Sequence, residues 1–388
     1  NKLRRSMATF RNLGTIDEFG PKMVNGMVAR GYKRAFAERC FKQIEGFGSY
    51  GFPESHALAF AKLVYVSAWV KCHQPAVFAC ALLNSQPMGF YAPAQIVRDA
   101  REHGVEVRHV DVNASSWHNS LERDAVGAPA LRLGFRQIGG FKEGWAQRIE
   151  AARTDGALCN VEELARRADL PARALQLLAD ADAFQALALS RRDAMWQAHR
   201  TPESELPLFA VTTAHELGEE PDMALPIMPD SEEVVADYQM IRLSLRQHPM
   251  SFLREGLRTQ GTLSSEEAAQ AKPGSRVRVA GVVLIRQRPG KGNAIFVTLE
   301  DETGITNLLI WARTFERLRR PVMSARLMIA EGVLQKSPEG VIHLMTDCVE
   351  DASHLLGKLE ESHSEPAEPD RARHPRNVRV LPKSRDFH

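Results

Sequence analysis

The sequence predicts a multidomain α+β protein, in which a mostly helical region precedes a small β-barrel. Apolar residues recur three and four positions apart over most of the first 200 residues, whereas they alternate with polar residues from 275 to 350. Five prolines between 201 and 230 indicate a linker. A chain of 388 residues is long enough for two or three domains, each with its own core.

The first 85 residues are predicted to be helical. A glycine-rich turn at 46–53 precedes a strongly periodic helix at 55–71, and Pro75 begins another helix. Ser55 is expected to cap the periodic helix, because a serine hydroxyl can accept a hydrogen bond from the first turn.

A connecting α/β segment follows at 86–125, with a helix at 95–102 and short alternating strands at 105–107 and 110–112. Alanine- and leucine-rich helices are then predicted at 131–200. The expected organisation, in chain order, is a helical part at 1–85, the α/β segment at 86–125, a helical domain at 126–200, the linker at 201–230, a helical segment at 231–272 with its helix at 232–258, the barrel at 273–352 and a tail at 353–388.

The last third of the chain carries five predicted strands. Three of them precede a short helix at 314–320 and two follow it, which is the order of a five-stranded OB barrel. The strands are expected at 277–283, 295–299, 305–311, 327–334 and 341–349. The tail is polar, contains prolines and is predicted to be disordered. Six basic residues between 371 and 385 would attract a phosphate backbone, or the tail is simply solvated.

Composition narrows the class of protein. A net charge of +2 neither indicates nor excludes a nucleic-acid binder, because local patches decide such binding. The five cysteines include no C-x-x-C pair, so neither a zinc site nor a disulfide framework is expected, and a cytoplasmic location is predicted. No apolar run reaches the roughly 18 residues of a membrane helix, so no membrane partner is expected.

One motif joins the glycine-rich turn to the helix that follows it. Its ordered residues are Ser55-His56-Ala57, then Trp69-Val70-Lys71, then His73-Gln74-Pro75. A turn, a serine cap and a core helix account for most of the pattern. A helix N-terminus bearing Ser and His is also suited to phosphate.

This ordered pattern resembles the fingers segment of bacterial C-family DNA polymerases, the family of the DNA polymerase III alpha subunit. Glu54 stands where replicative members usually carry lysine, and residues 81–113 are also similar to the error-prone, translesion branch. The resemblance implies a parent DNA-directed DNA polymerase, with Ser55 and His56 near the incoming nucleotide. We expect the chain to be the C-terminal third of that longer protein, with the end of the fingers at 1–85.

No catalytic residue and no cofactor are expected in this chain. Polymerases hold paired metal ions with two or three aspartates. The one Asp-x-Asp here, Asp180-Ala181-Asp182, is interpreted as a helix surface or helix end. The resemblance places the Mg²⁺ in a palm domain that this chain lacks.

Residues 133–153 resemble a helix-hairpin-helix, in which a glycine turn aims backbone N–H groups at a DNA phosphate. The candidate contacts are Gly139, Gly140 and Lys142, where Lys142 stands in place of the usual second glycine. A helix-turn-helix packing unit is the alternative.

The linker contains the sequence Glu205-Leu206-Pro207-Leu208-Phe209. It resembles a sliding-clamp peptide, whose leucines and aromatic fill an apolar groove. Leu206, Leu208 and Phe209 are the candidate contacts, with the clamp and other translesion proteins as partners. The alternative, which is equally supported, is that these side chains pack against a neighbouring domain.

Basic and aromatic residues on the barrel are the remaining candidates for DNA. OB barrels bind single strands with cations and stacking aromatics. The candidates are Arg286, Arg288, Lys291, Phe296, Trp311 and Arg313. Phe296 can instead belong to the core, and small barrels also dock proteins.

The function predicted from all of these patterns is that of the DNA-binding C-terminal portion of an error-prone DNA polymerase. It would hold the primer–template and the incoming nucleotide during synthesis across damage. The alternative is a stand-alone nucleic-acid-binding or scaffold protein without catalysis.

Overall fold

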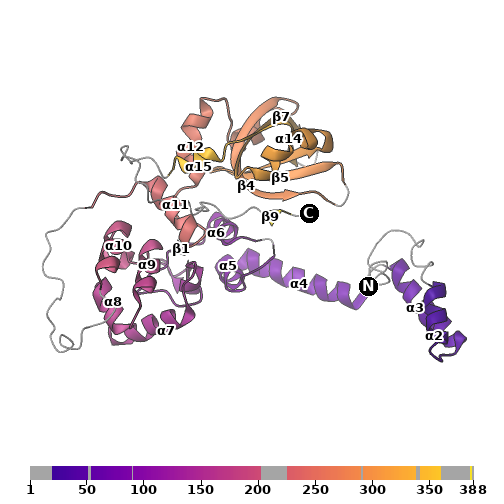
Figure 1. The fold of residues 1–388 in the computed structure, drawn as a ribbon, viewed down its shortest axis with the longest axis horizontal. Helices are drawn as coiled ribbons and strands as arrows, with labels where there is room; N and C mark the ends of the chain where they lie inside the picture. Colours follow the sequence, from indigo (N-terminus) through magenta and orange to yellow (C-terminus); the bar gives the residue numbers. More distant parts are fainter. Residues whose placement is uncertain are drawn as a thin grey trace, which may run out of the picture. The chain divides into compact units, whose positions relative to one another are not determined.

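The computed structural model describes residues 20–50, 54–89, 91–201, 225–289, 292–337, 341–359 and 385–386 (Figure 1). They fall into two compact units, Asn1–Phe78 and Ala79–His388. None of the helices in the described part of the chain has the length and apolar character needed to cross a membrane.

The described residues of the first unit are mostly helical, as predicted. It contains α2 (Gly20–Val28), α3 (Arg34–Tyr50), α4 (Glu54–His73) and the start of α5 (Pro75–Asn84). Gly20 lies against the ring of Phe41, since an added Cβ would come within 2.8 Å of it.

Two local predictions in this unit are wrong. The backbone of α3 stays helical through Gly46 and Gly48, where a turn was expected. Glycine costs a helix only about 1 kcal/mol, so it weakens the helix without ending it. Ser55 is not the cap, because α4 begins one residue earlier at Glu54.

The second unit begins with α6 (Pro93–Glu102) and a small sheet of order β1-β3-β2. The strands are β1 (Val107–Arg108), β2 (Ser120–Arg123) and β3 (Pro129–Arg132). Strands β2 and β3 were not predicted, and β3 lies partly where a helix was expected. The predicted strand at 110–112 does not form. Its alternation reflects burial instead, because Val112 is buried and its N–H donates to the carbonyl of Ala183.

Short helices then build an alanine- and leucine-rich core, as predicted. They are η3 (Phe135–Gln137), α7 (Glu143–Ala152), η4 (Arg153–Asp155), α8 (Val161–Arg167), α9 (Ala172–Asp180), η5 (Gln185–Leu187) and α10 (Arg191–Arg200). Asn160 caps α8 and Ser190 caps α10 through their side chains. Asp180 ends α9, but Asp182 is buried and has a φ of 57°, so it is not a surface residue.

The single helix predicted at 232–258 is two helices, α11 (Asp230–Met240) and α12 (Pro249–Arg258). Pro249 explains the interruption, because proline lacks the N–H that would continue a helix and restricts the residue before it. A short helix, α13 (Ser265–Gln270), follows and carries a capping box between Ser264 and Glu267.

The OB barrel is confirmed. Its strands are β4 (Arg276–Gln287), β5 (Ala294–Glu300), β6 (Ile305–Trp311), β7 (Leu327–Lys336) and β8 (Ile342–Asp351), with α14 (Ala312–Ser324) between β6 and β7. The order is β5-β6-β8-β7-β4, and pairing of β4 with β5 closes the barrel. Its core includes Val297, Leu308 and Ile310, all fully buried.

The described residues directly after the barrel are ordered, where a disordered tail was predicted. Helix α15 (His354–Gly357) follows β8, and Leu356 and Leu359 are buried in a cluster that contains Met250 of α12. These leucines explain the difference, since they bury apolar surface. A two-residue strand, β9 (Arg385–Asp386), pairs with β4. The rest of the predicted basic tail lies outside the described residues.

Candidate nucleic-acid interface

A row of apolar side chains crosses the outer face of the barrel. Phe296 is half-buried between the buried Ile295 and Val297, so it points away from the core. In strand register it lies opposite Leu309, which lies opposite Met345 of β8. Residues directly opposite each other share a face of the sheet, so this row is contiguous. The predicted alternative that Phe296 is a core residue is therefore wrong.

Trp311 extends this apolar surface at the end of β6. Its side chain is 51% exposed, and it is the last residue before α14. The N–H of Ala312 donates to Asn293, which brings the end of the β4–β5 hairpin to the start of α14. Arg288 is exposed beside that hairpin and donates to the carbonyl of Gly292, 3.2 Å away. Arg313 is exposed and forms no ion pair with another described residue.

The prediction that Arg286 contacts DNA is wrong, because its side chain is buried in the barrel wall. Its guanidinium donates to the carbonyls of Val322 and Ala325 at the end of α14. A bulge between Val283 and Ile285 shifts the register of β4, so that Arg286 pairs with the core residue Val297. Lys291 lies outside the described residues.

In the helix-hairpin-helix turn, one of the predicted phosphate donors is already bound within the protein. The N–H of Gly139 donates to the carbonyl of Met240, 2.8 Å away, so Gly139 is not available to a phosphate. Gly140 has a φ of 85°, which favours glycine, and nothing lies within 4 Å of the position its Cβ would take. Lys142 precedes α7 and its ammonium lies 4.9 Å from the ring centre of Trp145. Gly140 and Lys142 stay predictions as DNA contacts.

Ser55 and His56 lie in the first turn of α4, but their side chains are not among those described. Their role near a nucleotide stays a prediction. Leu206, Leu208 and Phe209 lie outside the described residues, so the clamp contact also stays a prediction.

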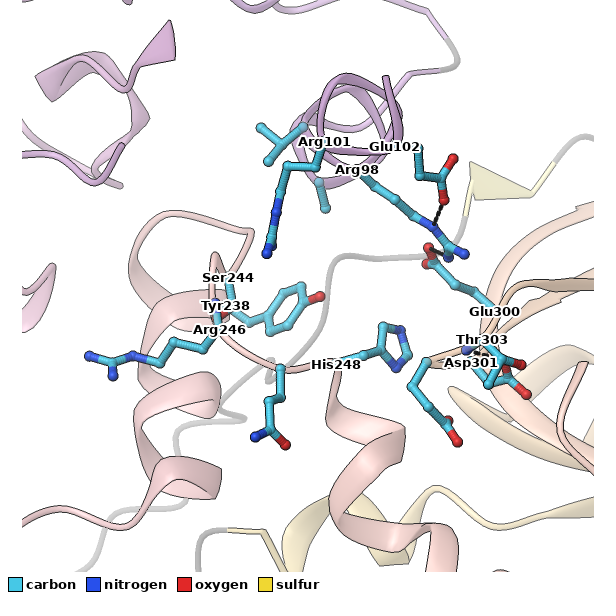
Figure 2. A pocket seen from close by; sticks show the side chains of 14 residues that line it. Arg98, Arg101, Glu102, Tyr238, Ser244, Arg246, His248, Glu300, Asp301 and Thr303 are labelled. Carbon is cyan, nitrogen blue, oxygen red and sulfur yellow. Dashed lines mark hydrogen bonds and ion pairs between the residues drawn. The ribbon is translucent and has the colours of Figure 1, made fainter. Parts of the chain in front are cut away.

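A polar pocket of about 470 Å³ lies where α6, residues 238–248 and the start of the β5–β6 turn meet (Figure 2). Arg98 projects from α6 and binds Glu102 at 2.8 Å and Glu300 of the barrel. Arg101 donates to the carbonyl of Leu245 at 3.1 Å, and Arg246 binds Asp182 at 2.8 Å.

Burial is the largest influence on the pKa values of Glu300 and His248, which line this pocket. It raises the pKa of the Glu300 carboxyl, with Arg98 opposing the shift. It lowers the pKa of His248 to about 4. Most cations of the pocket already have acidic or carbonyl partners, which makes it a joint between the helical region and the barrel and not an anion site. Within the described ranges, no group of three or more His, Cys, Asp or Glu side chains could hold a metal ion.

Comparison with known proteins agrees with this geometry. A helix-hairpin-helix motif family matches residues 104–194, and an OB-fold nucleic acid binding domain matches residues 277–352. A protein named error-prone DNA polymerase from Brucella abortus biovar 1 (strain 9-941) is 54% identical over 392 residues. A protein of the same name from Rhodopseudomonas palustris (strain HaA2) is 50% identical over 435 residues. The chain is homologous to part of an error-prone DNA polymerase.

The chain is covered completely by both matches, but it spans only 36% and 37% of the length of these relatives. The predicted relationship to error-prone DNA polymerases is confirmed. The activity of the whole enzyme, its substrates and its partners are proposals for this segment.

Part of the outer face of the barrel was not predicted from the sequence. Leu309 and Met345 were not identified, although their strands were. Arg319 and Arg320 were also missed, although they belong to the basic run that follows Trp311. Outward-facing positions can be found from alternation once the strand pairing is known, and the pairing of β6 with β8 joins residues far apart in the chain.

Proposed function

We propose that this segment is the DNA-binding part of a DNA-directed DNA polymerase that copies damaged templates. In this proposal the outer face of β5 and β6 holds single-stranded template. The observation that carries it is the exposed Trp311 at the end of the row that contains Phe296. Aromatic side chains on such a barrel face stack on bases of any sequence, as a polymerase that meets damaged templates requires.

Mg²⁺-dependent synthesis belongs to the same proposal, with the metal held by carboxylates of the longer enzyme. Paired metal ions stabilise the attacking and leaving oxygens of phosphoryl transfer. The part played by this segment is to position the template strand, and the names and identity of the relatives support that assignment.

The test is binding of an oligothymidylate to the 388-residue chain, measured by fluorescence anisotropy. Stacking on one aromatic contributes roughly 1–3 kcal/mol per base. Trp311→Ala should therefore weaken binding roughly 5- to 150-fold, while the salt dependence stays nearly unchanged.

Trp196→Ala is the matched control, because Trp196 of α10 is 49% exposed and lies outside the barrel. It should bind like the unchanged chain. Equal losses in both variants would remove the specific role of Trp311. No binding by the unchanged chain at low salt would contradict the DNA-binding proposal and favour a scaffold.

A further inference from the structure

Helix α14 presents arginines that the protein itself does not neutralise. Arg313, Arg319 and Arg320 are exposed, and none of them forms an ion pair with another described residue. Arg317 donates to the backbone carbonyl of Asp347 at 2.7 Å. Glu316 is the single acidic residue in this helix.

Two other arginines on the outside of the same barrel form ion pairs with acidic residues. Arg276 of β4 binds Glu331 at 2.5 Å and Asp347 at 2.8 Å. Arg278, two residues along the same strand, binds Glu350 at 3.0 Å. Exposed positive charge on β4 is thus matched by acids of β7 and β8, whereas the positive charge on α14 is not. A general excess of basic residues does not explain this difference, because the whole chain carries a net charge of only +2.

Packing holds the unmatched arginines on the outside of the barrel. Phe315 and Val322 are the buried residues of α14, and the helix packs against β5, β6 and β8 (Figure 1). Arg286 binds two carbonyls at the end of the helix from within the barrel wall. Non-helical backbone at Leu318 kinks α14 between Arg313 and the pair Arg319 and Arg320. One buried residue on each side of the kink anchors the helix, and these basic side chains stay exposed to solvent.

The basic helix continues directly from the aromatic surface. Trp311 is the residue before α14, and Arg313 follows it by two positions. Arg288 lies at the hairpin that the N–H of Ala312 contacts through Asn293. A strand whose bases stack on Trp311 would have its phosphates close to the start of α14.

We propose that α14 is a phosphate-binding strip for single-stranded DNA, in which Arg313, Arg319 and Arg320 contact the backbone of the strand that stacks on Trp311. This inference rests on the proposed function and extends it from bases to phosphates. Arginine suits the role, since its guanidinium donates to phosphate oxygens in a fixed fork.

The experiment is a salt titration of oligothymidylate binding to the full 388-residue chain. Each phosphate contact on a single strand steepens the slope of log K against log salt by roughly 0.7. The variant Arg313→Gln/Arg319→Gln/Arg320→Gln should therefore flatten the slope by about 2. The variant Arg276→Gln/Arg278→Gln should leave the slope unchanged, because those arginines are already paired with acids.

The outcomes separate this inference from the proposed function. If the unchanged chain binds and Trp311→Ala weakens binding, but the triple variant keeps the original slope, the strip is wrong and the stacking site stands. That result would also be expected if α14 served an acidic protein partner. If the unchanged chain does not bind, the proposed function fails first. Should the triple variant unfold, Arg313→Gln alone must still flatten the slope by about 0.7.

Discussion

Arg286 connects the wall of the barrel to the end of α14. The last carbonyls of a helix have no partner within the helix, and positive charge there interacts favourably with the helix dipole. The guanidinium of Arg286 supplies both, because it donates to the carbonyls of Val322 and Ala325. Its role is to fix the helix that carries the proposed phosphate-binding strip.

Replacing Arg286 should therefore change stability. Arg286→Met keeps much of the buried volume but leaves two carbonyls without their donor, so the free energy of unfolding should fall by about 1–3 kcal/mol. Urea denaturation followed by circular dichroism measures it. Arg288→Met, at an exposed neighbouring position, should change it by less than about 0.5 kcal/mol. Equal midpoints for the two variants would mean that Arg286 does not support the helix.

At the scale of single residues, type and position could be read from the sequence, whereas hydrogen-bond partners could not. Arg286 and Gly139 both fit a DNA contact, yet their donors serve carbonyls of the protein. Gly139 binds Met240, which lies on a helix beyond the linker. Trp311, a candidate for stacking on bases, is 51% exposed at the end of β6, and its contact with DNA stays a prediction.

At the scale of elements, α11 joins the helical region to the barrel. Its Asp237 binds Arg191 of α10, and both side chains are 1% exposed. Its Val235 packs in the cluster that contains Met250 of α12 and Ile329 of β7. Separating the two partners of a buried ion pair strongly destabilises the folded protein. This contact therefore favours the arrangement of α10 and α11 in which Asp237 and Arg191 meet.

The break between α11 and α12 should make this joint sensitive to acid. The Nδ1 atom of His248 accepts a hydrogen bond from the N–H of Met250 at 3.2 Å, which caps α12 and requires a neutral ring. Burial, with help from Arg98 and Arg254, lowers the pKa of His248 to about 4, against the opposing effects of Glu302 and Asp301. The unfolded imidazole binds a proton at about pH 6.5. This stabilisation is therefore complete above pH 6.5 and is lost as the pH falls towards 4.

His248→Asn removes the titration and keeps an oxygen that can cap α12. When the pH falls from 7 to 5, the free energy of unfolding of the unchanged chain should decrease by about 1–2 kcal/mol more than that of the variant. This range includes a reduction for solvent screening in the open pocket. Urea titrations at both pH values measure this difference. Parallel stability curves for the two proteins would show that His248 does not couple the joint to pH.

Periodicity predicted the long elements and failed for the short ones. All five barrel strands were placed, because buried and exposed residues alternate along them. Strands β2 and β3 have four residues each. Strand β2 alternates only between half-buried and exposed positions, and β3 begins with Pro129, so neither gives a clear apolar alternation in the sequence. The apolar spacing continues from α11 into α12, but Pro249 starts a new helix because proline cannot donate the N–H that would continue the first one.

At the scale of the whole molecule, the change from helical to alternating periodicity correctly separated the helical region from the barrel. The relationship to error-prone DNA polymerases also followed from ordered motifs in the sequence. The joint could not be predicted, since it depends on contacts such as Arg98 with Glu300, which are 202 residues apart. The proposed path of DNA could not be derived from the sequence alone, because it combines the faces of β5, β6 and α14.

The central claim is that a single strand lies on the outer face of β5 and β6 with its bases on aromatic side chains. Photocrosslinking tests it most directly, using an oligothymidylate that carries 5-iodouracil and the full 388-residue chain, with crosslinked peptides identified by mass spectrometry. The account predicts crosslinks at Trp311 or Phe296, and their loss in high salt together with binding. Crosslinks confined to residues 91–201, or binding without any crosslink to the barrel, would contradict it.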